Sequence, residues 1–530
     1  MPRSACSATC TARNEAVPAD AAAQLADRGK YRRGVRVVAG PTQDVLIIGA
    51  GLGGLSAALH LAGAGRSVTV VERESVPGGR CGLIADGGYR FDTGPTVLTM
   101  PDLVAAPLNA VGEELADWVT LRRLDPAYRA RFADGSSIHV RADVTDMAEE
   151  IAAVCGGAEA TAWLRYVEFL RKLYAIEMPH FIDRNLDSPL QLVSPSLARL
   201  VALGGFRRLS PKIGSFFRDE RLRRLFSFQA MYAGLAPAQA LAIYAVITYM
   251  DCVEGVYFPE GGMHAVPRAL AAAAQKHGVQ FRYNTTVQSI DVRGGRAAGV
   301  ITSAGERMPA DVVVVNADLP TAYQRLLPEQ YRPRRLNRLR YSPSAVVLHA
   351  GSSTGFDDPA HHTIEFGDAW DETFDEIIRR GEPMSDPSFL LTSPTVTDPS
   401  LAPAQRHAYY ALFPAPNMTG RVDWHAERDR YRDRIVETIE KRGYAGFGAG
   451  IEVEHVVTPA DWQAAGLAAG APFAASHTFG QTGPFRPATL DRRIENLVFC
   501  GSNTQPGVGV PMVLVSGRLA AERVTGPTRA

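Results

Sequence analysis

Three glycines follow a short apolar run near the N-terminus with the spacing G-x-G-x-x-G. The run is 45–48, and the glycines are Gly49, Gly51 and Gly54. Gly49 would allow a tight turn, Gly51 would let backbone N–H groups approach a pyrophosphate, and Gly54 would let the next helix pack closely on a sheet. The chemistry that this spacing predicts is the binding of a dinucleotide at the positive end of a helix.

Two charged positions extend this prediction. A second apolar run, 68–71, ends on Glu72, whose carboxylate could accept hydrogen bonds from ribose hydroxyls, and Arg73 follows it. Gly78 and Gly79 precede Arg80, a second glycine-rich turn whose cation suits another contact with the pyrophosphate. The order of strand, helix, strand and acidic residue argues against an ordinary glycine-rich loop. The second turn favours FAD over NAD.

The motifs resemble a known superfamily. GAGLGGLSAALHLA, Glu72 and PGGR resemble the FAD-dependent amine oxidases and carotenoid desaturases. Within that superfamily, four further segments resemble the bacterial-type phytoene desaturases, with actinobacterial members the most similar: 89–102, 255–270, 360–377 and 500–524. The resemblance covers about 41–526 in one continuous order.

The resemblance implies FAD as cofactor and further residues near it. The implied flavin contacts outside the first motifs are Thr93, Gly94, Pro95, Val287, Gly501, Ser502, Gly509, Val510 and Met512. Asn503 stands where relatives often carry a small residue, so its role is open. The resemblance also places an acidic residue and an arginine near the flavin, at Glu168 and Arg171. An ordinary surface ion pair at i and i+3 is the alternative for these two.

The activity implied by the resemblance is stepwise desaturation of phytoene towards lycopene. An oxidised flavin can take a hydride from an allylic carbon, and the resulting cation loses a proton from its neighbour. Dioxygen or a quinone would reoxidise the flavin. The alternatives are desaturation of a thirty-carbon precursor, oxidation of a carotenoid end group, amine oxidation, and a non-enzymatic isoprenoid escort. The loop PGVGVPMV carries no aromatic residue, which argues against amine oxidation.

These motifs require an α/β fold, namely an interrupted Rossmann-type FAD-binding domain with an inserted mixed α+β substrate domain. The FAD-binding parts are expected at 41–141, 255–330 and 476–530, the substrate parts at 142–254 and 331–475, and a disordered extension at 1–40. Strands are expected at 280–283, 287–292, 297–302, 311–318 and 497–500, and helices at 55–65, 160–176, within 218–250, at 263–277 and at 513–524. Gly294-Gly295 predicts a hairpin turn.

Two neighbouring stretches bear on a membrane. Residues 225–250 carry no charge, and Gly234 and Pro237 interrupt them, so buried helices are favoured over a transmembrane span. The preceding stretch, 197–224, is basic and is either a solvated helix face or a membrane-surface patch. Because phytoene resides in lipid, the membrane patch is favoured if the resemblance holds. A cytoplasmic, peripherally membrane-associated bacterial enzyme is therefore expected.

Composition excludes several other classes. Lys plus Arg and Asp plus Glu are equal at 56 each, so no global field predicts a nucleic-acid partner. The six cysteines form no C-x-x-C pair, so neither a metal site nor a disulfide framework is indicated. Residues 1–40 do not resemble a secretory signal; a transit peptide or a misassigned start are the alternatives to disorder. The sequence does not indicate an oligomeric state.

Overall fold

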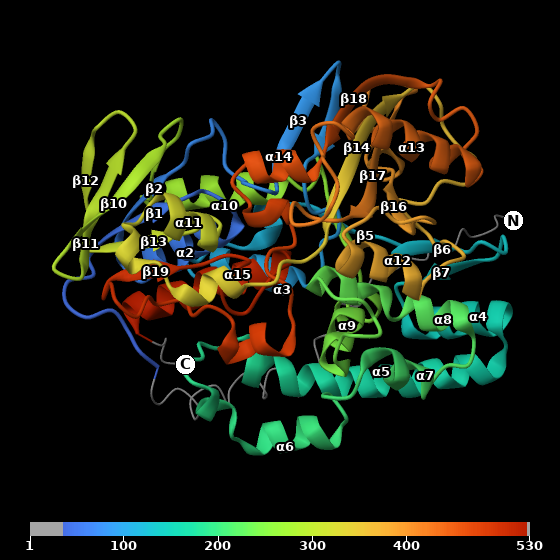
Figure 1. Ribbon diagram of the computed structural model, residues 1–530, viewed down its shortest axis with the longest axis horizontal. Coiled ribbons are helices and arrows are strands. Elements are labelled where there is room, and N and C mark those ends of the chain that lie inside the picture. The colour runs from blue at the N-terminus through green and yellow to red at the C-terminus, as the bar shows by residue number, and fades with distance from the viewer. Residues whose placement is uncertain (1–34, 527–530) are drawn as a thin grey trace, which may run out of the picture.

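The computed structural model describes residues 35–526. A parallel sheet lies at one end of the molecule, a mixed sheet at the other, and a layer of helices runs along the lower edge of the view (Figure 1). Most of the segment expected as an N-terminal extension, 1–34, lies outside the described residues.

The parallel sheet confirms the predicted nucleotide-binding core. Its order is β19-β13-β1-β2-β9, and all its pairings are parallel. Its strands are β1 (Asp44–Ile48), β2 (Ser67–Val71), β9 (Gln280–Arg282), β13 (Val312–Val315) and β19 (Leu497–Phe499). The β-branched run of β13 is buried along its whole length, as a central strand covered on both faces requires. Segments distant in sequence therefore build one sheet.

Four helices pack around this sheet. They are α2 (Leu52–Gly63), α3 (Pro101–Asn109), α10 (Ala265–Lys276) and α15 (Val510–Thr525). Both α2 and α15 begin three residues earlier than the sequence pattern indicated. The sequence pattern missed the first turn of α2 because it contains Gly53 and Gly54, and glycine is a poor helix former. Here the two glycines serve as sites of close contact. Pro511 occupies the first turn of α15, where a missing N–H costs nothing.

A three-stranded antiparallel sheet lies beside the nucleotide core. It contains β10 (Val287–Arg293), β11 (Arg296–Thr302) and β12 (Arg307–Pro309). Gly294 and Gly295 join the first two strands with φ of 56° and 79°, which confirms the predicted hairpin turn. The short helix α11 (Leu319–Arg325) follows β13.

The mixed sheet has the order β18-β14-β17-β16-β15-β6-β7. Its strands are β6 (Tyr128–Arg131), β7 (Ser137–Val140), β14 (Ser344–Ser352), β15 (His362–Glu365), β16 (Phe389–Thr392), β17 (His407–Ala415) and β18 (Ile451–Val457). The β6–β7 hairpin falls within 41–141, the segment expected in the FAD-binding domain, yet β6 pairs with β15 of this sheet. The chain thus leaves the nucleotide core earlier than expected. The sequence does not reveal this boundary, because a pairing across more than two hundred residues leaves no local signal.

Smaller elements connect these layers. β3 (Leu83–Asp86) and β4 (Tyr89–Asp92) form a hairpin, and β5 (Leu121–Arg123) pairs antiparallel with β8 (Tyr257–Pro259), which lies far from it in the sequence. The helices beside the mixed sheet are α12 (Asp371–Asp375), α13 (Arg428–Lys441) and α14 (Pro459–Ala464).

The helical layer contains α4 (Val144–Cys155), α5 (Gly157–Glu177), α6 (Pro195–Ala202), α7 (Leu209–Gly214), α8 (Glu220–Leu225) and α9 (Val246–Cys252). The charge-free stretch 225–250 forms short pieces, η5 (Phe228–Ala233), η6 (Ala242–Ala245) and α9, as expected for buried helices. Gly234 ends η5 with a φ of 71°. Within residues 35–526, no helix has both the length and the apolar character needed to cross a bilayer.

Candidate functional site

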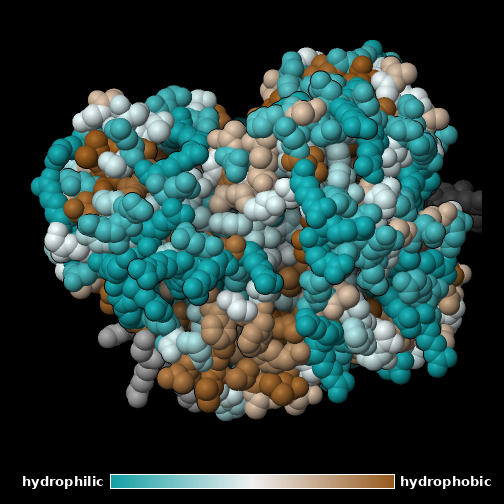
Figure 2. Space-filling model, viewed as in Figure 1, coloured by the Kyte–Doolittle hydropathy of each residue, from teal (hydrophilic) through white to brown (hydrophobic). Residues whose placement is uncertain are grey.

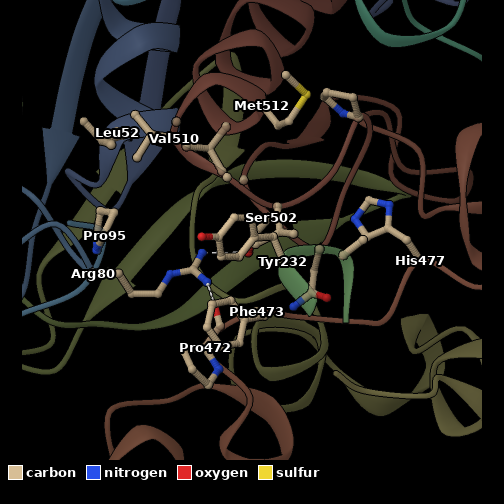
Figure 3. A pocket seen from close by; sticks show the side chains of 18 of the residues that line it. Leu52, Arg80, Pro95, Tyr232, Pro472, Phe473, His477, Ser502, Val510 and Met512 are labelled. Atoms are coloured by element: carbon tan, nitrogen blue, oxygen red, sulfur yellow. Dashed lines mark hydrogen bonds between the residues drawn. The ribbon is translucent and has the colours of Figure 1, made fainter. Parts of the chain in front are cut away.

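A cavity of about 1330 Å³ runs between the nucleotide core, the mixed sheet and the helical layer. Its walls include both glycine-rich turns of the first βαβ unit and the glycine loop before α15. Figure 3 shows side chains from these separate segments facing a common space, among them Leu52, Arg80, Ser502 and Met512. The chain therefore brings its predicted binding motifs to one place.

The first glycine loop joins β1 to α2 in the way the spacing predicts. Gly49 has a φ of 98°, a left-handed conformation that favours glycine. A Cβ at Gly54 would lie 2.2 Å from the Gly49 carbonyl oxygen, so only glycine permits this contact. The N-terminus of the twelve-residue α2 consequently faces the cavity at Gly51 and Leu52, which suits a diphosphate.

Glu72 fixes the end of β2 against this loop. Its carboxylate accepts hydrogen bonds from the backbone N–H groups of Ala50 at 2.7 Å and Glu74 at 3.0 Å. The side chain is buried yet lines the cavity, so it can also accept a ribose hydroxyl. Arg73 lines the same region and pairs with Glu74 at 2.9 Å.

The second glycine turn meets the first directly. Gly78 forms a parallel bridge to Gly51, and Gly79 lies beside it. Arg80 donates to Ser502 Oγ and to the Pro472 carbonyl oxygen, both at 2.6 Å (Figure 3). Burial lowers the pKa of Arg80, which the nearby Asp318 opposes. The cation thus joins the N-terminal turn to the C-terminal loop.

The C-terminal glycine loop forms another wall. Gly501 and Gly509 have φ of 106° and 111°, which lets the backbone turn close to the cavity. Asn503, whose role the sequence left open, donates from its amide to Asp318 and accepts from the Ala475 N–H at 2.8 Å. The loop is therefore held from two sides before α15 begins.

Residues 52–525 match the family model described as flavin containing amine oxidoreductase. The chain belongs to this family. The phytoene dehydrogenase of Streptomyces griseus is 56% identical over 493 residues, covering 92% of this chain and 96% of that protein. The zeta-carotene-forming phytoene desaturase of Myxococcus xanthus is 38% identical, covering 91% and 93%. Cyclohexylamine oxidase from Brevibacterium oxydans shares the fold, with a TM-score of 0.57 at 17% identity, covering 92% of this chain and 99% of that one.

FAD is the cofactor of this flavin-containing oxidoreductase, and the cavity fits it. A Cβ at Gly51 would lie 2.9 Å from the Asn316 amide, so the diphosphate cradle depends on a missing side chain. The other residues that the sequence indicated for the cofactor line the cavity too: Gly49, Glu72, Arg73, Gly79, Arg80, Thr93, Gly94, Pro95, Val287, Gly501, Ser502, Gly509, Val510 and Met512. Gly54 lies behind them, where it allows the close packing of α2 on the turn at Gly49.

The structure does not bring Glu168 and Arg171 to this flavin site. The two side chains pair with each other at 3.0 Å on α5, are 59% and 52% exposed, and do not line the cavity. The i, i+3 spacing of an acid and an arginine on a helix is the same for a surface ion pair as for a functional pair, so the sequence could not distinguish the two. The geometry is that of a solvated ion pair, and it gives no support to a catalytic role.

Several cavity residues were missed by the sequence analysis. Asn316 donates from its amide to the Gly49 carbonyl oxygen at 3.3 Å, and Asp318 binds the C-terminal loop. Both follow β13, and polar residues at the carboxyl end of a parallel strand are a signal that could have identified them. Glu177, Asp251 and His477 also line the cavity, but they come from the helical layer and a loop, where no motif marks them.

His361 and His362 make hydrogen bonds to threonines away from the cavity. Their Nδ1 atoms contact Thr397 Oγ1 at 2.7 Å and Thr392 Oγ1 at 2.9 Å, and neither ring lines the cavity. Burial lowers the pKa of His361 to about 3, so it remains neutral. No group of three side chains suited to hold a metal occurs within the described part of the chain.

Gly51→Val should abolish FAD binding, because the new side chain would occupy the diphosphate cradle beside Asn316. The measurement is flavin absorbance and stoichiometry in the purified, folded variant. Gly157→Val is the matched control, since a Cβ there meets no atom within 4 Å, and it should retain FAD. Wild-type flavin content in the Gly51 variant would contradict this site.

Glu168→Gln should leave flavin content unchanged and turnover within about twofold of wild type, because an exposed ion pair contributes little. Steady-state turnover and flavin absorbance check this. A loss of about 10² in turnover, with the flavin spectrum intact, would instead restore the role implied by the resemblance.

Proposed function

We propose that this flavoprotein is a phytoene desaturase that dehydrogenates phytoene stepwise towards lycopene. The observation that carries the proposal is the character of the cavity beyond the flavin loops. Its walls there are mainly aliphatic and aromatic, with Leu192, Leu197, Leu200, Ile243, Ile247, Met250, Phe479 and Phe485 among them. A long hydrocarbon suits such walls, because it brings no polar group that would need a partner.

The relatives support the same substrate class. The Streptomyces protein named phytoene dehydrogenase matches over nearly its whole length. Of two Myxococcus relatives, one is named as a phytoene desaturase that forms zeta-carotene and the other as a desaturase of all-trans-zeta-carotene. The likeness to cyclohexylamine oxidase concerns the fold alone. Val508 and Val510 of the glycine loop line the cavity, and the loop segment PGVGVPMV contains no aromatic residue. This agrees with a hydrocarbon substrate rather than an amine.

Bound FAD supplies the two-electron oxidant for removal of a hydride from an allylic carbon. The chain's own contribution is to hold the polyene against the glycine loop, exclude water and accept the proton. We infer dioxygen or a quinone as the final electron acceptor.

Purified holoenzyme should convert phytoene in liposomes to more desaturated carotenoids, with lycopene as the final product on chromatography. The thirty-carbon precursor is the comparison substrate. Faster conversion of that precursor would assign the enzyme to the sister activity, and failure to bleach the flavin anaerobically with either would contradict the proposal.

We further propose that the enzyme takes phytoene from a bilayer through the mouth of the cavity. An apolar rim lies at this mouth: Val193, Phe206, Phe479 and Phe485 line the cavity, and Leu190 is an exposed neighbour of the cavity residue Pro189. Leu190, Val193 and Phe479 are 79%, 77% and 60% exposed. Figure 2 shows a hydrophobic patch along the lower edge of the molecule, where α6 lies in Figure 1. Burial of each large rim side chain in lipid would contribute about 1.5–3 kcal/mol.

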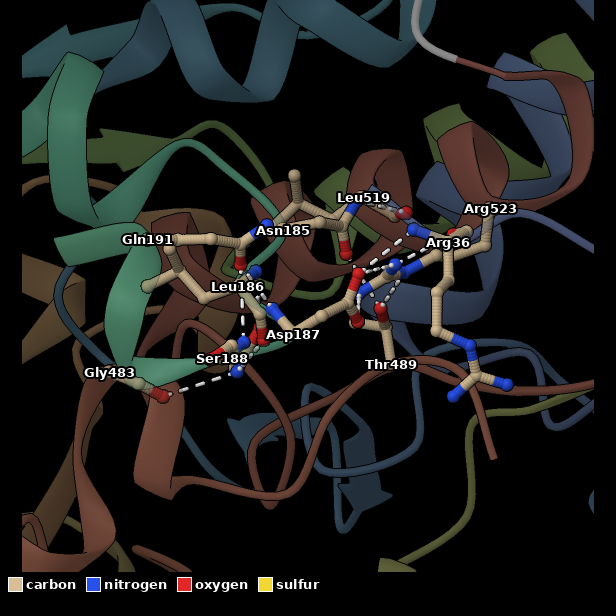
Figure 4. Close-up of polar contacts among 11 residues, drawn as sticks. Arg36, Asn185, Leu186, Asp187, Ser188, Gln191, Gly483, Thr489, Leu519 and Arg523 are labelled. Carbon is tan, nitrogen blue, oxygen red and sulfur yellow. Dashed lines mark hydrogen bonds and ion pairs between the residues drawn. The ribbon is translucent and has the colours of Figure 1, made fainter. Parts of the chain in front are cut away.

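The segment that carries Leu190 and Val193 is anchored to α15 and to the loop before it by polar contacts (Figure 4). Arg523, which is fully buried, donates to both carboxylate oxygens of Asp187 at 2.8 and 2.9 Å. Asn185 donates to the Leu519 carbonyl oxygen at 3.0 Å, and Gln505 both accepts from and donates to the backbone of Leu186. The exposed apolar residues are therefore presented outward by a fixed base.

The basic stretch contributes less to this surface than its sequence suggested. Arg221 pairs with Asp219 at 2.7 Å, Arg224 with Glu220 at 3.3 Å, and Lys212 lies 4.5 Å from the Phe169 ring. Arg207 and Arg208 are exposed next to Phe206. Each would add about 1 kcal/mol of attraction to anionic lipid. We therefore assign most of the docking energy to the apolar rim.

Leu190→Asp combined with Val193→Asp should reduce binding to liposomes and activity on liposome-borne phytoene at least tenfold, because two charges would have to enter lipid. Co-sedimentation and product formation measure this, and flavin content should not change. Val396→Asp, on an exposed residue away from the mouth, is the control. Equal binding by all three proteins would show that the rim does not dock the enzyme.

A further inference from the structure

Apart from Glu74, which is exposed and pairs with Arg73, four carboxyl groups at the cavity wall are candidates to accept a proton: Glu72, Asp318, Glu177 and Asp251. The first two are already engaged. Glu72 accepts from two backbone N–H groups, and Asp318 accepts from Asn503, Thr321 and Ala468. Donors already occupy both oxygens of each of these carboxylates, so the choice lies between Glu177 and Asp251.

Asp251 has the surroundings of a base. It belongs to α9, is 3% exposed, and accepts a long hydrogen bond from Tyr128 Oη at 3.4 Å. The titratable groups facing it are Tyr128 and Tyr232, with Cys252 next to it on α9. Tyr232 reaches the part of the cavity that Arg80 and Ser502 border (Figure 3). Asp251 and Tyr232 thus line the same cavity as the C-terminal glycine loop.

Glu177 differs from Asp251 in its surroundings. It lies at the end of α5, is 5% exposed, and its Oε1 has no hydrogen-bond partner among the described residues. Burial alone raises the pKa of Glu177 well above its usual value, which favours its neutral form. Burial also raises the pKa of Asp251, but only to about 7, while Tyr128 lowers it. The Tyr128 hydroxyl therefore stabilises the carboxylate of Asp251, whereas Glu177 Oε1 has no donor among the described residues.

We propose that Asp251 is the catalytic residue that accepts the proton in each desaturation. This rests on the proposed function. Bound FAD would supply the two-electron oxidant, taking the hydride of one allylic C–H bond in each step and becoming reduced. The neighbouring C–H bond gives its proton to the Asp251 carboxylate, and the electron pair of that bond becomes the new C=C bond. The carbocation left on the substrate after loss of the hydride would be costly in an apolar cavity. Removal of the proton by Asp251 neutralises it and so favours the overall reaction.

Asp251→Asn should slow anaerobic flavin bleaching by phytoene about 10²-fold without changing FAD content. In wild type the bleaching rate should rise with pH through about 7, because the carboxylate is the active form. The variant should lose this dependence. Glu177→Gln, a second buried carboxyl of the same cavity, should keep the wild-type midpoint.

Infrared spectroscopy gives a readout independent of turnover. The holoenzyme should show a protonated-carboxyl band that titrates near pH 7 and is absent from Asp251→Asn. Tyr128→Phe removes the donor that lowers the pKa of Asp251, so both the band and the rate profile should move to higher pH. This variant keeps the carboxyl group and tests the inference even if the Asn variant does not fold.

The outcomes separate the two proposals. Wild-type enzyme that phytoene cannot bleach would overturn the proposed function, whatever the infrared titration shows. Bleaching by wild type together with an unchanged rate and pH profile in Asp251→Asn would overturn the base assignment alone. An unshifted profile in Tyr128→Phe, or loss of the profile in Glu177→Gln, would overturn it as well.

Discussion

The direct contact between α2 and α15 is the constraint on which the site depends. A Cβ at Gly517 would lie 2.3 Å from the Gly53 carbonyl oxygen, and Ser56 Oγ donates to the Leu514 carbonyl oxygen at 2.7 Å. The two backbones approach this closely because glycine leaves no side chain between them. The loop before α15 is thereby held against the loop before α2. Segments from near both ends of the described chain therefore form walls of the same cofactor cavity.

The sequence predicted the parts of the fold that depend on local pattern. The β1–α2–β2 unit, the hairpin at Gly294-Gly295 and the buried strand β13 follow from glycine spacing and runs of β-branched residues. The pairing of β6 with β15 could not be predicted, because it joins segments whose local sequences carry no mark of each other. Distant pairing is a property of the packed molecule.

The candidate site divides in the same way. Glycines and Glu72 are recognisable because a phosphate cradle imposes a fixed spacing on them. Asp251 has no such spacing, and only its burial beside Tyr128 distinguishes it from any other aspartate. Glu168 illustrates the reverse case, since its helical spacing to Arg171 was conspicuous while its exposure is not visible in sequence. Environment, rather than residue type, separates these two acids.

The contact between Arg523 and Asp187 also constrains the order in which parts of the protein can fold during synthesis. β19 and α15 supply an edge strand of the parallel sheet and the last wall of the cavity, and both come from the final part of the described chain. During synthesis, Asp187 and the apolar residues after it leave the ribosome long before their buried partner exists. An incomplete chain therefore exposes these apolar side chains, which favours aggregation unless a chaperone binds it. The full wall of the cofactor cavity exists only after α15 has emerged.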